Sequence, residues 1–328
     1  MRRLLAIAVL AVAAAAALPA FAPTAVAQDY PVRSINLIVP APAGGPMDVG
    51  ARVLAAIAEK AIGQPIVVVN KVGAGGQIGW TELARAKPDG YTIGYIIMPG
   101  TNTVIADPER QAIFDENTFI QLVNQVHDVG VVWVRADSPY KTLKDLVEAA
   151  KEKPGTIRAS TTGLLSDDHL NILVTEEAVP GAKFRLVHLD GAAGQLKETL
   201  GGNVDVSFDN VGSVVKPLKA GQIRVLAVTD KERSKFLPDI PNTTELGYPT
   251  IISASTRGIA APKGTPPAII ARLTEVLKIA MADPDHLKRL EEQGLLVKPL
   301  AGAEFKAYWL EQHERAKKYT EWAKKRPQ

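Results

Sequence analysis

The sequence predicts an α/β protein of two domains with a ligand cleft between them, and three observations support this. Short apolar runs of β type alternate with helical patterns in two successive sets. Glycine-rich loops follow several of these runs and lead into helix starts. The chain reads as helical from about residue 263 to its end, without a strand set of its own, so we expect this segment to return to the first domain.

This organisation predicts two crossings between the domains, near residues 125–135 and 250–260, which would form a hinge. We therefore expect domain I to comprise residues 28–126 and 256–328, and domain II to comprise residues 127–255. In open parallel sheets, ligands bind at the carboxyl ends of the strands, so the loops after the strands are the candidate site.

The first residues have the layout of a secretory signal peptide. A basic start precedes an uncharged, alanine-rich stretch, and Ala25 and Ala27 place small residues two apart in a cleavage-type motif. A membrane anchor is the alternative, but Pro19 and Pro23 interrupt the stretch, and the sequence has no Cys for lipid attachment. We expect residues 1–27 to be a signal peptide that is removed on export.

Composition limits the classes of function. Removing 27 residues from 328 leaves 301, enough for about two domains. The formal net charge falls from +3 to +1, because Arg2 and Arg3 are the charged residues of the removed segment. A near-neutral body has no electrostatic signature of nucleic-acid or anionic-membrane binding. No later segment has the roughly 20 uninterrupted apolar residues that span a bilayer.

The first set has the order β-α-β-α-β. Gly63 stands where a C-cap glycine would end the first helix. The strands are nearly continuous apolar runs, which is typical of strands covered by helices on both faces. We expect strands at 35–40, 65–70 and 91–97, and helices at about 48–62 and 76–86.

The second set begins near residue 127. Its expected strands are 129–134, 156–161, 183–189, 204–208 and 223–229, and its expected helices are 143–152, 167–178 and 193–202. Beyond it, Pro266 and Pro267 suit the first turn of a helix, and Pro284 interrupts that helix. The aromatic residues of the last helix are expected to be core contacts rather than a ligand cage; they are Phe305, Tyr308, Trp309 and Tyr319.

Two loops of the first set, at 40–48 and 70–79, each join a strand to a helix start through glycines. Unobstructed backbone N–H groups and the positive end of the helix dipole suit an anion there. A P-loop is excluded because the chain has no Gly-Lys dipeptide. A dinucleotide fingerprint fails because Ile78 takes the place of its third glycine. Asp48 is placed to cap its helix or to favour the first turn.

Polar residues also gather at a helix start of the second set, in the order Ser166, Asp167, Asp168, His169. Adjacent residues on a helix do not face one another, so they cannot form a catalytic triad. We interpret Ser166 or Asp167 as the helix cap and expect His169 to pack or hydrogen-bond locally. Asp209 ends a strand on the cleft side, where it either caps the next turn or contacts ligand. The histidines show no paired metal-ligand spacing, so we expect no metal and no cofactor.

The chain resembles the Bug-type solute receptors, the periplasmic binding components of tripartite tricarboxylate transporters, over its whole mature length. The matching stretches include "YPVRSINLIVPAPAGGPMDVGARVLA", "GQPIVVVNKVGAGGQIGWTELARAKPDGYTIGY", "KTLKDLVEAAKEKPGTIRASTTG" and "GIAAPKGTPPAIIARLTEVLKIAMADP". The resemblance implies a Venus-flytrap fold of two α/β domains in the periplasm of a Gram-negative bacterium. It also implies a small carboxylate held in the cleft by backbone N–H groups, partly through waters.

The resemblance further implies which residues bind the ligand. From domain I they are Ala43, Gly44, Gly45, Asp48, Gly75, Gly76, Gln77 and Thr101. From domain II they are Thr162, Ser166, His169, Gly191, Ala192, Ala193 and Asp209.

Two segments depart from the family pattern. The family often reads Pro-Tyr-Lys-Gly where this chain has "HLDG", and it often has Trp and an aromatic residue where this chain has Thr256 and Arg257. Arg257 could pair a distal carboxylate bidentately, and Asp190 could pair an amine or a hydroxyl-rich ligand. A solvent-exposed substitution is the alternative for each.

Three functions are weighed. The favoured one is a monomeric periplasmic receptor that closes on an organic acid and hands it to the large and small membrane subunits of a permease. A receptor that presents its closed form to a signalling partner has the same sequence features. A secreted hydrolase or isomerase would use His169 or His188 with Asp209, but the sequence lacks the nucleophile or metal constellation that this needs.

Overall fold

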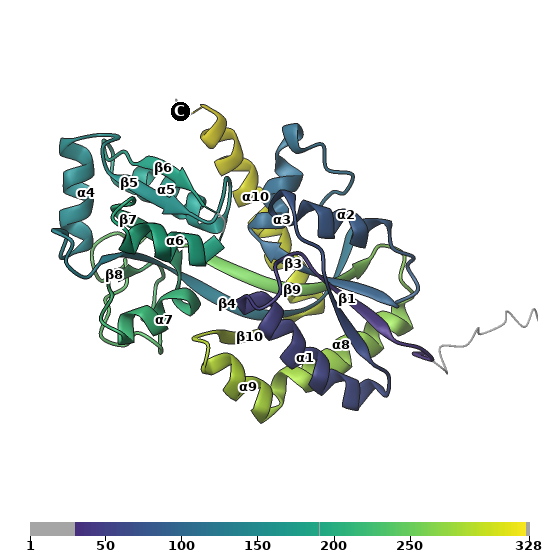
Figure 1. Cartoon of the computed structure of the whole chain (residues 1–328). Helices are drawn as coiled ribbons and strands as arrows, with labels where there is room; N and C mark the ends of the chain where they lie inside the picture. The colour runs from purple at the N-terminus through teal and green to yellow at the C-terminus, as the bar shows by residue number, and fades with distance from the viewer. Residues whose placement is uncertain (1–29, 190, 326–328) are drawn as a thin grey trace, which may run out of the picture. The chain divides into compact units, whose positions relative to one another are not determined.

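The structure is a computed structural model that describes residues 30–189 and 191–325. The expected signal peptide at 1–27 and the candidate ligand residue Asp190 lie outside the described residues. From Pro31 onward the chain forms one compact α/β unit (Figure 1). Within the described ranges, no helix combines the length and the apolar character that a membrane crossing requires.

The first set has the expected order. Strand β1 lies between β2 and β3 and is parallel to both. Helix α1 begins at Pro46, two residues before the expected start, because proline suits the first turn, and it ends at Gly63 in the left-handed conformation. The elements are β1 (Ile35–Val39), α1 (Pro46–Ile62), β2 (Ile66–Asn70), η1 (Ala74–Gly76), α2 (Gln77–Arg85), β3 (Thr92–Met98), α3 (Gly100–Ala106) and η2 (Pro108–Arg110).

The next strand, β4 (Phe119–Arg135), is 17 residues long, and the sequence predicted only its second half. Its first half pairs antiparallel with β9 (Ala254–Pro262), and the two strands lie side by side (Figure 1). Its second half pairs antiparallel with β7 (Val206–Asn210) and β8 (Ile223–Val228). The first half went unpredicted because buried polar side chains, Asn124 among them, interrupt its apolar pattern.

The other expected elements of the second set are present in the expected order, but helix α7, between β7 and β8, was not predicted. Strand β5 lies between β6 and β7 and is parallel to both. The mixed pairing differs from the open parallel sheets that the sequence pattern indicated, because β4 pairs in the antiparallel sense with strands of both sets and β9 joins the first set antiparallel to β3. The elements are α4 (Leu143–Glu152), β5 (Arg158–Thr161), α5 (Asp167–Ala178), β6 (Arg185–His188), α6 (Gly191–Leu200) and α7 (Val211–Lys219).

Gly130 marks the point where β4 exchanges one set of partners for the other. Its N–H donates to the Ser253 carbonyl oxygen at 2.8 Å, and its carbonyl accepts from the Thr229 N–H at 2.8 Å. A Cβ atom at this position would lie 2.4 Å from Thr229 Oγ1 and 3.0 Å from the Ser253 carbonyl oxygen. The close approach of three segments therefore requires glycine.

The last part of the chain corrects one expectation. It is not helical to its end, because β10 (Leu296–Ala301) pairs antiparallel with the first half of β4. Pro299 lies within the register shift of this strand, where a missing N–H interrupts no regular ladder. The short run with an internal proline had too little pattern to predict a strand. The helices are α8 (Pro267–Ala282), α9 (Pro284–Glu291) and α10 (Gly302–Lys325), with the predicted break at Pro284.

Helix α10 contacts both sets. Phe305 and Trp309 are fully buried with the side chains of α2 and β3, which confirms that they are core residues. Farther along the helix, Tyr319 packs with Leu170 and Leu173 of α5. The end of the chain therefore joins the first set to the second.

Candidate functional site

A cavity of about 220 Å³ lies where several elements begin or end. One side is formed by Pro46, the first residue of α1, and by Gln293 after α9. The other side is formed by the starts of α6 and α7 and by the end of β7. The lining includes Ala192, Ala193, Asp209, Gly212, Ser213 and Lys216.

Three helix N-termini reach this cavity. Pro46 begins α1, Ala192 is in the first turn of α6, and Gly212 is in the first turn of α7. The first N–H groups of a helix have no partner within the helix, and the helix dipole adds positive charge at that end. One such donor is already used, because the Gly212 N–H donates to Asp128 Oδ1 at 3.0 Å. The remaining arrangement favours an anionic group.

Three residues of the sequence-predicted site, Ala192, Ala193 and Asp209, line the cavity together. The predicted loop at Ala43, Gly44 and Gly45 ends directly before Pro46, so it stands at the edge of the cavity. Gly191 is the first residue of α6, directly before Ala192. The structure therefore brings the opening loop of the first set beside two loops of the second set.

Asp48 holds the opening loop in place. Its Oδ2 accepts from the Gly44 N–H at 2.9 Å and from Arg52 Nε at 3.0 Å, and its Oδ1 accepts from Asn70 Nδ2 at 2.9 Å. Burial alone would raise the pKa of Asp48, but the bonds from Arg52, Gly44 and Asn70 outweigh it, so the pKa lies below its ordinary value. Both carboxylate oxygens are engaged within the protein, and the side chain fixes the loop that carries the backbone donors.

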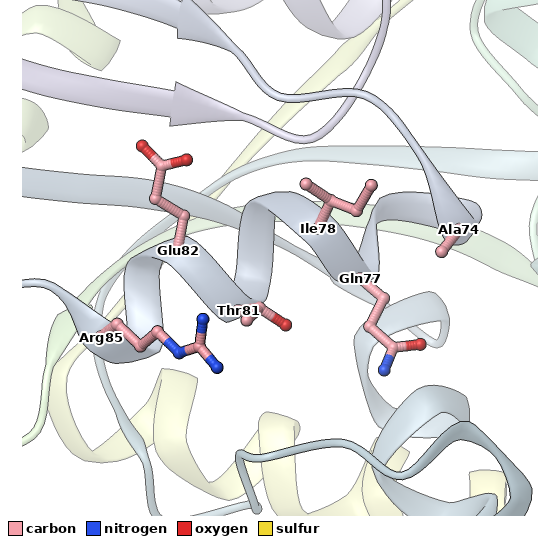
Figure 2. A pocket seen from close by; sticks show the side chains of 6 residues that line it. All are labelled: Ala74, Gln77, Ile78, Thr81, Glu82 and Arg85. Atoms are coloured by element: carbon pink, nitrogen blue, oxygen red, sulfur yellow. The ribbon is translucent and has the colours of Figure 1, made fainter.

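The second glycine loop lies elsewhere. Gly75 and Gly76 form the turn before α2, and Gln77 Nε2 donates to the Arg110 carbonyl oxygen at 2.8 Å. Gln77 instead lines a separate hollow of about 480 Å³ along α2. Figure 2 shows that its six lining residues belong to this one helix and the turn before it.

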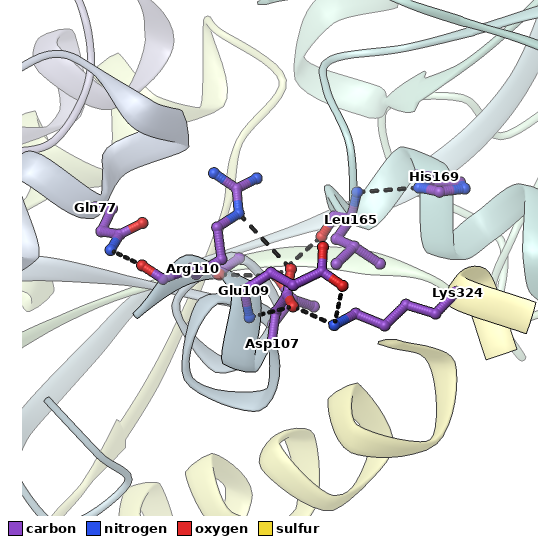
Figure 3. Close-up of polar contacts among 9 residues, drawn as sticks. Gln77, Asp107, Glu109, Arg110, Leu165, His169 and Lys324 are labelled. Carbon is purple, nitrogen blue, oxygen red and sulfur yellow. Dashed lines mark hydrogen bonds and ion pairs between the residues drawn. The ribbon is translucent and has the colours of Figure 1, made fainter. Parts of the chain in front are cut away.

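Thr101 is buried in the first turn of α3, where its Oγ1 accepts from the Ile97 N–H at 2.8 Å. Two residues farther on, Thr103 Oγ1 donates to the Leu165 carbonyl oxygen at 3.0 Å and so ties α3 to the loop before α5. The N–H of the same residue, Leu165, donates to His169 Nδ1 at 3.0 Å (Figure 3). Figure 3 also shows Lys324 of α10 at Asp107, which anchors the end of that helix to the first set.

The polar residues at the start of α5 hold one another. Ser166 is the N-cap, and its side chain accepts from the His169 N–H at 3.3 Å, which confirms the capping interpretation. The His169 ring packs edge-on against His188 at 5.0 Å between centroids. Thr162 Oγ1 donates to Asp168 Oδ2 at 2.6 Å. Thr162, Ser166 and His169 are thus engaged in local contacts of the loop and the helix.

Arg257 is buried, so it is not a solvent-exposed substitution. Its side chain, on β9, donates from Nη2 to Asp128 Oδ2 on β4 at 3.0 Å. Its Nε and Nη1 have no hydrogen-bond partner among the described residues. One of its five N–H donors is therefore committed to Asp128. A bidentate pair with a ligand carboxylate stays a prediction.

Four buried carboxyl groups lie near one another, namely Asp128, Asp167, Asp168 and Asp209, and the charge of Arg257 acts on the first two. Burial raises the pKa of Asp128 to about 6, although Arg257 and the Gly212 N–H oppose the shift. Burial raises the pKa of Asp209 to about 7, and the charges of Asp128 and Asp167 add to it. Burial also raises the pKa of Asp167. The pKa of Asp168 is raised well above its usual range by burial and by its carboxylate neighbours.

Sequence reasoning missed several residues here, namely Asp128, Trp133, Lys216 and Gln293. A lone acid inside the apolar run before "VGVVWV" was the available signal for Asp128. Nothing in the sequence marks Lys216 or Gln293, because their place at the cavity depends on how α7 and the turn after α9 meet. No group of His, Cys, Asp or Glu side chains in the described part of the chain is arranged to hold a metal ion.

The fold and the cavity are those of the class of periplasmic solute-binding proteins: an α/β protein in which one long strand, β4, pairs with strands of both sets, with helix N-termini around a small cavity. The chain belongs to the tripartite tricarboxylate transporter receptor family, whose family model matches residues 50–321. This confirms the resemblance that the sequence motifs indicated. The family consists of transport binding proteins and not of enzymes, which sets the hydrolase hypothesis aside.

Individual relatives agree with this assignment. The chain is 32% identical to protein BugT of Bordetella pertussis, over 82% of each chain. It resembles the structure of the periplasmic binding protein BugD, with a TM-score of 0.78 and 30% identity over 90% of this chain and 98% of BugD. It also resembles MatC of Rhodopseudomonas palustris with bound malate, with a TM-score of 0.79 and 26% identity over 89% of this chain and 100% of MatC.

Proposed function

We propose that the protein is an exported receptor that captures a small organic carboxylate in the cavity at α1, α6 and α7. It then delivers this ligand to the large and small membrane subunits of a tripartite tricarboxylate-type permease. The convergence of three helix N-termini on one cavity carries this proposal, because it supplies backbone donors and positive charge to an anion. The malate bound by MatC supports it.

The proposal includes a hinge. Domain I would comprise residues 28–126 and 256–328, domain II residues 127–255, and β4 and β9 would bend where β4 exchanges partners at Gly130. The receptor would act as a monomer in the periplasm of a Gram-negative bacterium after removal of residues 1–27.

The proposed site assigns two kinds of role. Backbone N–H groups of the opening loop and of the α6 start contact the carboxylate; these residues are Ala43, Gly44, Gly45, Gly191, Ala192 and Ala193. Asp48, Thr101, Thr162, Ser166 and His169 position the loops, as their contacts within the protein support. Gly75, Gly76 and Gln77 would join the site on closure, and Asp209 faces the rest of the ligand.

Thermal unfolding of the mature protein, freed of bound ligand by denaturation and refolding, tests this function. The panel contains mono-, di- and tricarboxylates, amino acids, and the amide of each acid. A ligand that binds only the folded state stabilises that state, by about 2.7 kcal/mol at 100 times its Kd, and this stabilisation raises the midpoint temperature of unfolding. We expect a shift with at least one class of acids and its loss with the amides. A shift with neutral solutes alone would contradict the proposal.

A further inference from the structure

The charges around the cavity are unequal in a way that bears on the ligand. Four buried carboxyl groups lie near one another, and the buried guanidinium of Arg257 donates to one of them, Asp128. Asp209 is the member of this group that lines the cavity. Its Oδ1 accepts from the Asn210 N–H at 2.7 Å, and the Ser213 hydroxyl hydrogen-bonds to its carboxylate. No Lys, Arg or His within the described ranges forms an ion pair with Asp209.

Two hydrogen-bond donors of the cavity lining have no negatively charged acceptor among the described residues. Lys216 lines the rim, and its Nζ lies 3.3 Å from the neutral Gln293 Oε1. Trp133 lines the cavity and is 1% exposed, and its indole Nε1 has no partner among the residues that the structure describes. A buried N–H without an acceptor costs free energy, so a ligand acceptor at this position is favoured.

From this arrangement we propose that the ligand is a zwitterion: its carboxylate binds at the helix N-termini and Lys216, and its protonated nitrogen binds Asp209. The inference rests on the proposed function and specifies its ligand class. A cavity with one carboxylate and one ammonium group at different positions complements an amino acid better than it complements a dicarboxylate. A second ligand carboxylate at Asp209 would face a buried carboxyl group and its acidic neighbours.

The pH dependence of binding separates the two ligand classes by sign. A ligand ammonium lowers the pKa of Asp209 from about 7, so its binding releases a proton and strengthens as pH rises through 7. A second carboxylate raises that pKa further, so its binding takes up a proton and weakens over the same range. The charged groups that face Asp209 or border the cavity are Asp128 on β4, Asp167 and Asp168 on α5, and Lys216 on α7, and Arg257 on β9 acts on Asp128 and Asp167.

Isothermal calorimetry with matched ligand pairs tests the inference. Each pair has the same number of methylene groups and differs in one end, an ammonium or a carboxylate: β-alanine with succinate, and 4-aminobutyrate with glutarate. The titrations are run at pH 6 and 8 on the wild type, on Asp209→Asn, and on Asp239→Asn, an exposed carboxylate of the second set with the same change in charge. Circular dichroism checks that each variant is folded.

We expect the wild type to prefer the amino member of at least one pair, more strongly at pH 8 than at pH 6. Asp209→Asn should reduce that preference roughly 10- to 100-fold, while Asp239→Asn keeps it. A preference for the dicarboxylates, or an unchanged preference in Asp209→Asn, would overturn the zwitterion and leave the carboxylate receptor standing. Binding of no acid from either series, in this assay and in the wider unfolding panel, would overturn both.

Discussion

Asp48 and Asp209 are both buried aspartates at a junction from a strand to a helix, yet their surroundings differ. Asp48 receives bonds from Arg52, Asn70 and the Gly44 N–H, and its pKa lies below the ordinary value. Asp209 has neutral partners and acidic neighbours, and its pKa is raised to about 7. The carboxylate of Asp48 has its cationic and hydrogen-bond partners within the protein and holds a loop. The carboxyl group of Asp209 has no cationic partner among the described residues. The same residue type near a strand-to-helix junction is thus paired within the protein in one set and, in our proposal, is left for a ligand in the other.

The largest effect is expected from Arg257→Met, which removes the buried cation whose charge acts on Asp128 and Asp167. Asp128 would lose its ion-pair partner in a buried site, so we expect a loss of roughly 3–5 kcal/mol in the free energy of unfolding at pH 8. Because the pKa of Asp128 is about 6, a proton can replace the arginine in acid, and the loss should be smaller at pH 5. Urea unfolding at both pH values measures this. Arg289→Met, in an exposed pair, is the control, and an equal loss there would contradict the prediction.

Asp48→Asn should disrupt the contacts that Asp48 makes with Gly44, Arg52 and Asn70. The amide cannot accept from Gly44, Arg52 and Asn70 together, so we expect a destabilisation of about 2 kcal/mol and weaker ligand binding. Since the folded pKa of Asp48 is lowered, its contribution is present above the unfolded pKa of about 3.8 and is lost as pH falls through the folded value. Urea unfolding at pH 7 and pH 3 checks both points. Equal stability of the variant and the wild type at pH 7 would show that Asp48 does not hold the loop.

Asp209→Asn should act in the opposite direction on stability. A carboxyl group whose folded pKa is raised makes the protein less stable as pH rises from about 4 to 7. The amide removes that cost, so we expect the variant to gain on the order of 1–3 kcal/mol relative to wild type between pH 4.5 and 8. Unfolding curves without ligand across this range measure the gain. A constant difference between the two proteins would mean that Asp209 does not titrate there.

The smallest effect is expected from Lys216→Met. Lys216 is exposed at the rim of the cavity and contacts only a neutral side chain in the described residues, so stability should change by less than about 0.5 kcal/mol. Carboxylate affinity should fall roughly two- to fivefold at low salt, and the difference should shrink at high salt because exposed charges are screened. Calorimetry at two salt concentrations tests this, and unchanged affinity at low salt would remove Lys216 from the site. Lys219→Met, an exposed change on the same helix, is the control.

Much of the fold could be predicted because its signals are local. The glycine at the end of α1, the Ser166 cap and the break at Pro284 each depend on a few adjacent residues. The first half of β4 and all of β10 went unpredicted for the converse reason. Their pairing is with distant strands, and polar residues such as Asn124, and the proline in β10, weaken the local pattern.

The site divides in the same way. Backbone loops that end at helix starts, such as Gly44-Gly45 and Gly191-Ala192, are visible in the sequence because glycine patterns and helix caps are local. Asp48 has cationic and amide partners and Asp209 has no cationic partner among the described residues. This difference depends on which side chains from other elements reach each carboxyl group. The sequence by itself determined the family, the alternation of strands and helices, and the presence of glycine-rich loops before helix starts. Only the tertiary structure decided which charges are paired, because burial and pairing depend on groups far apart in the chain.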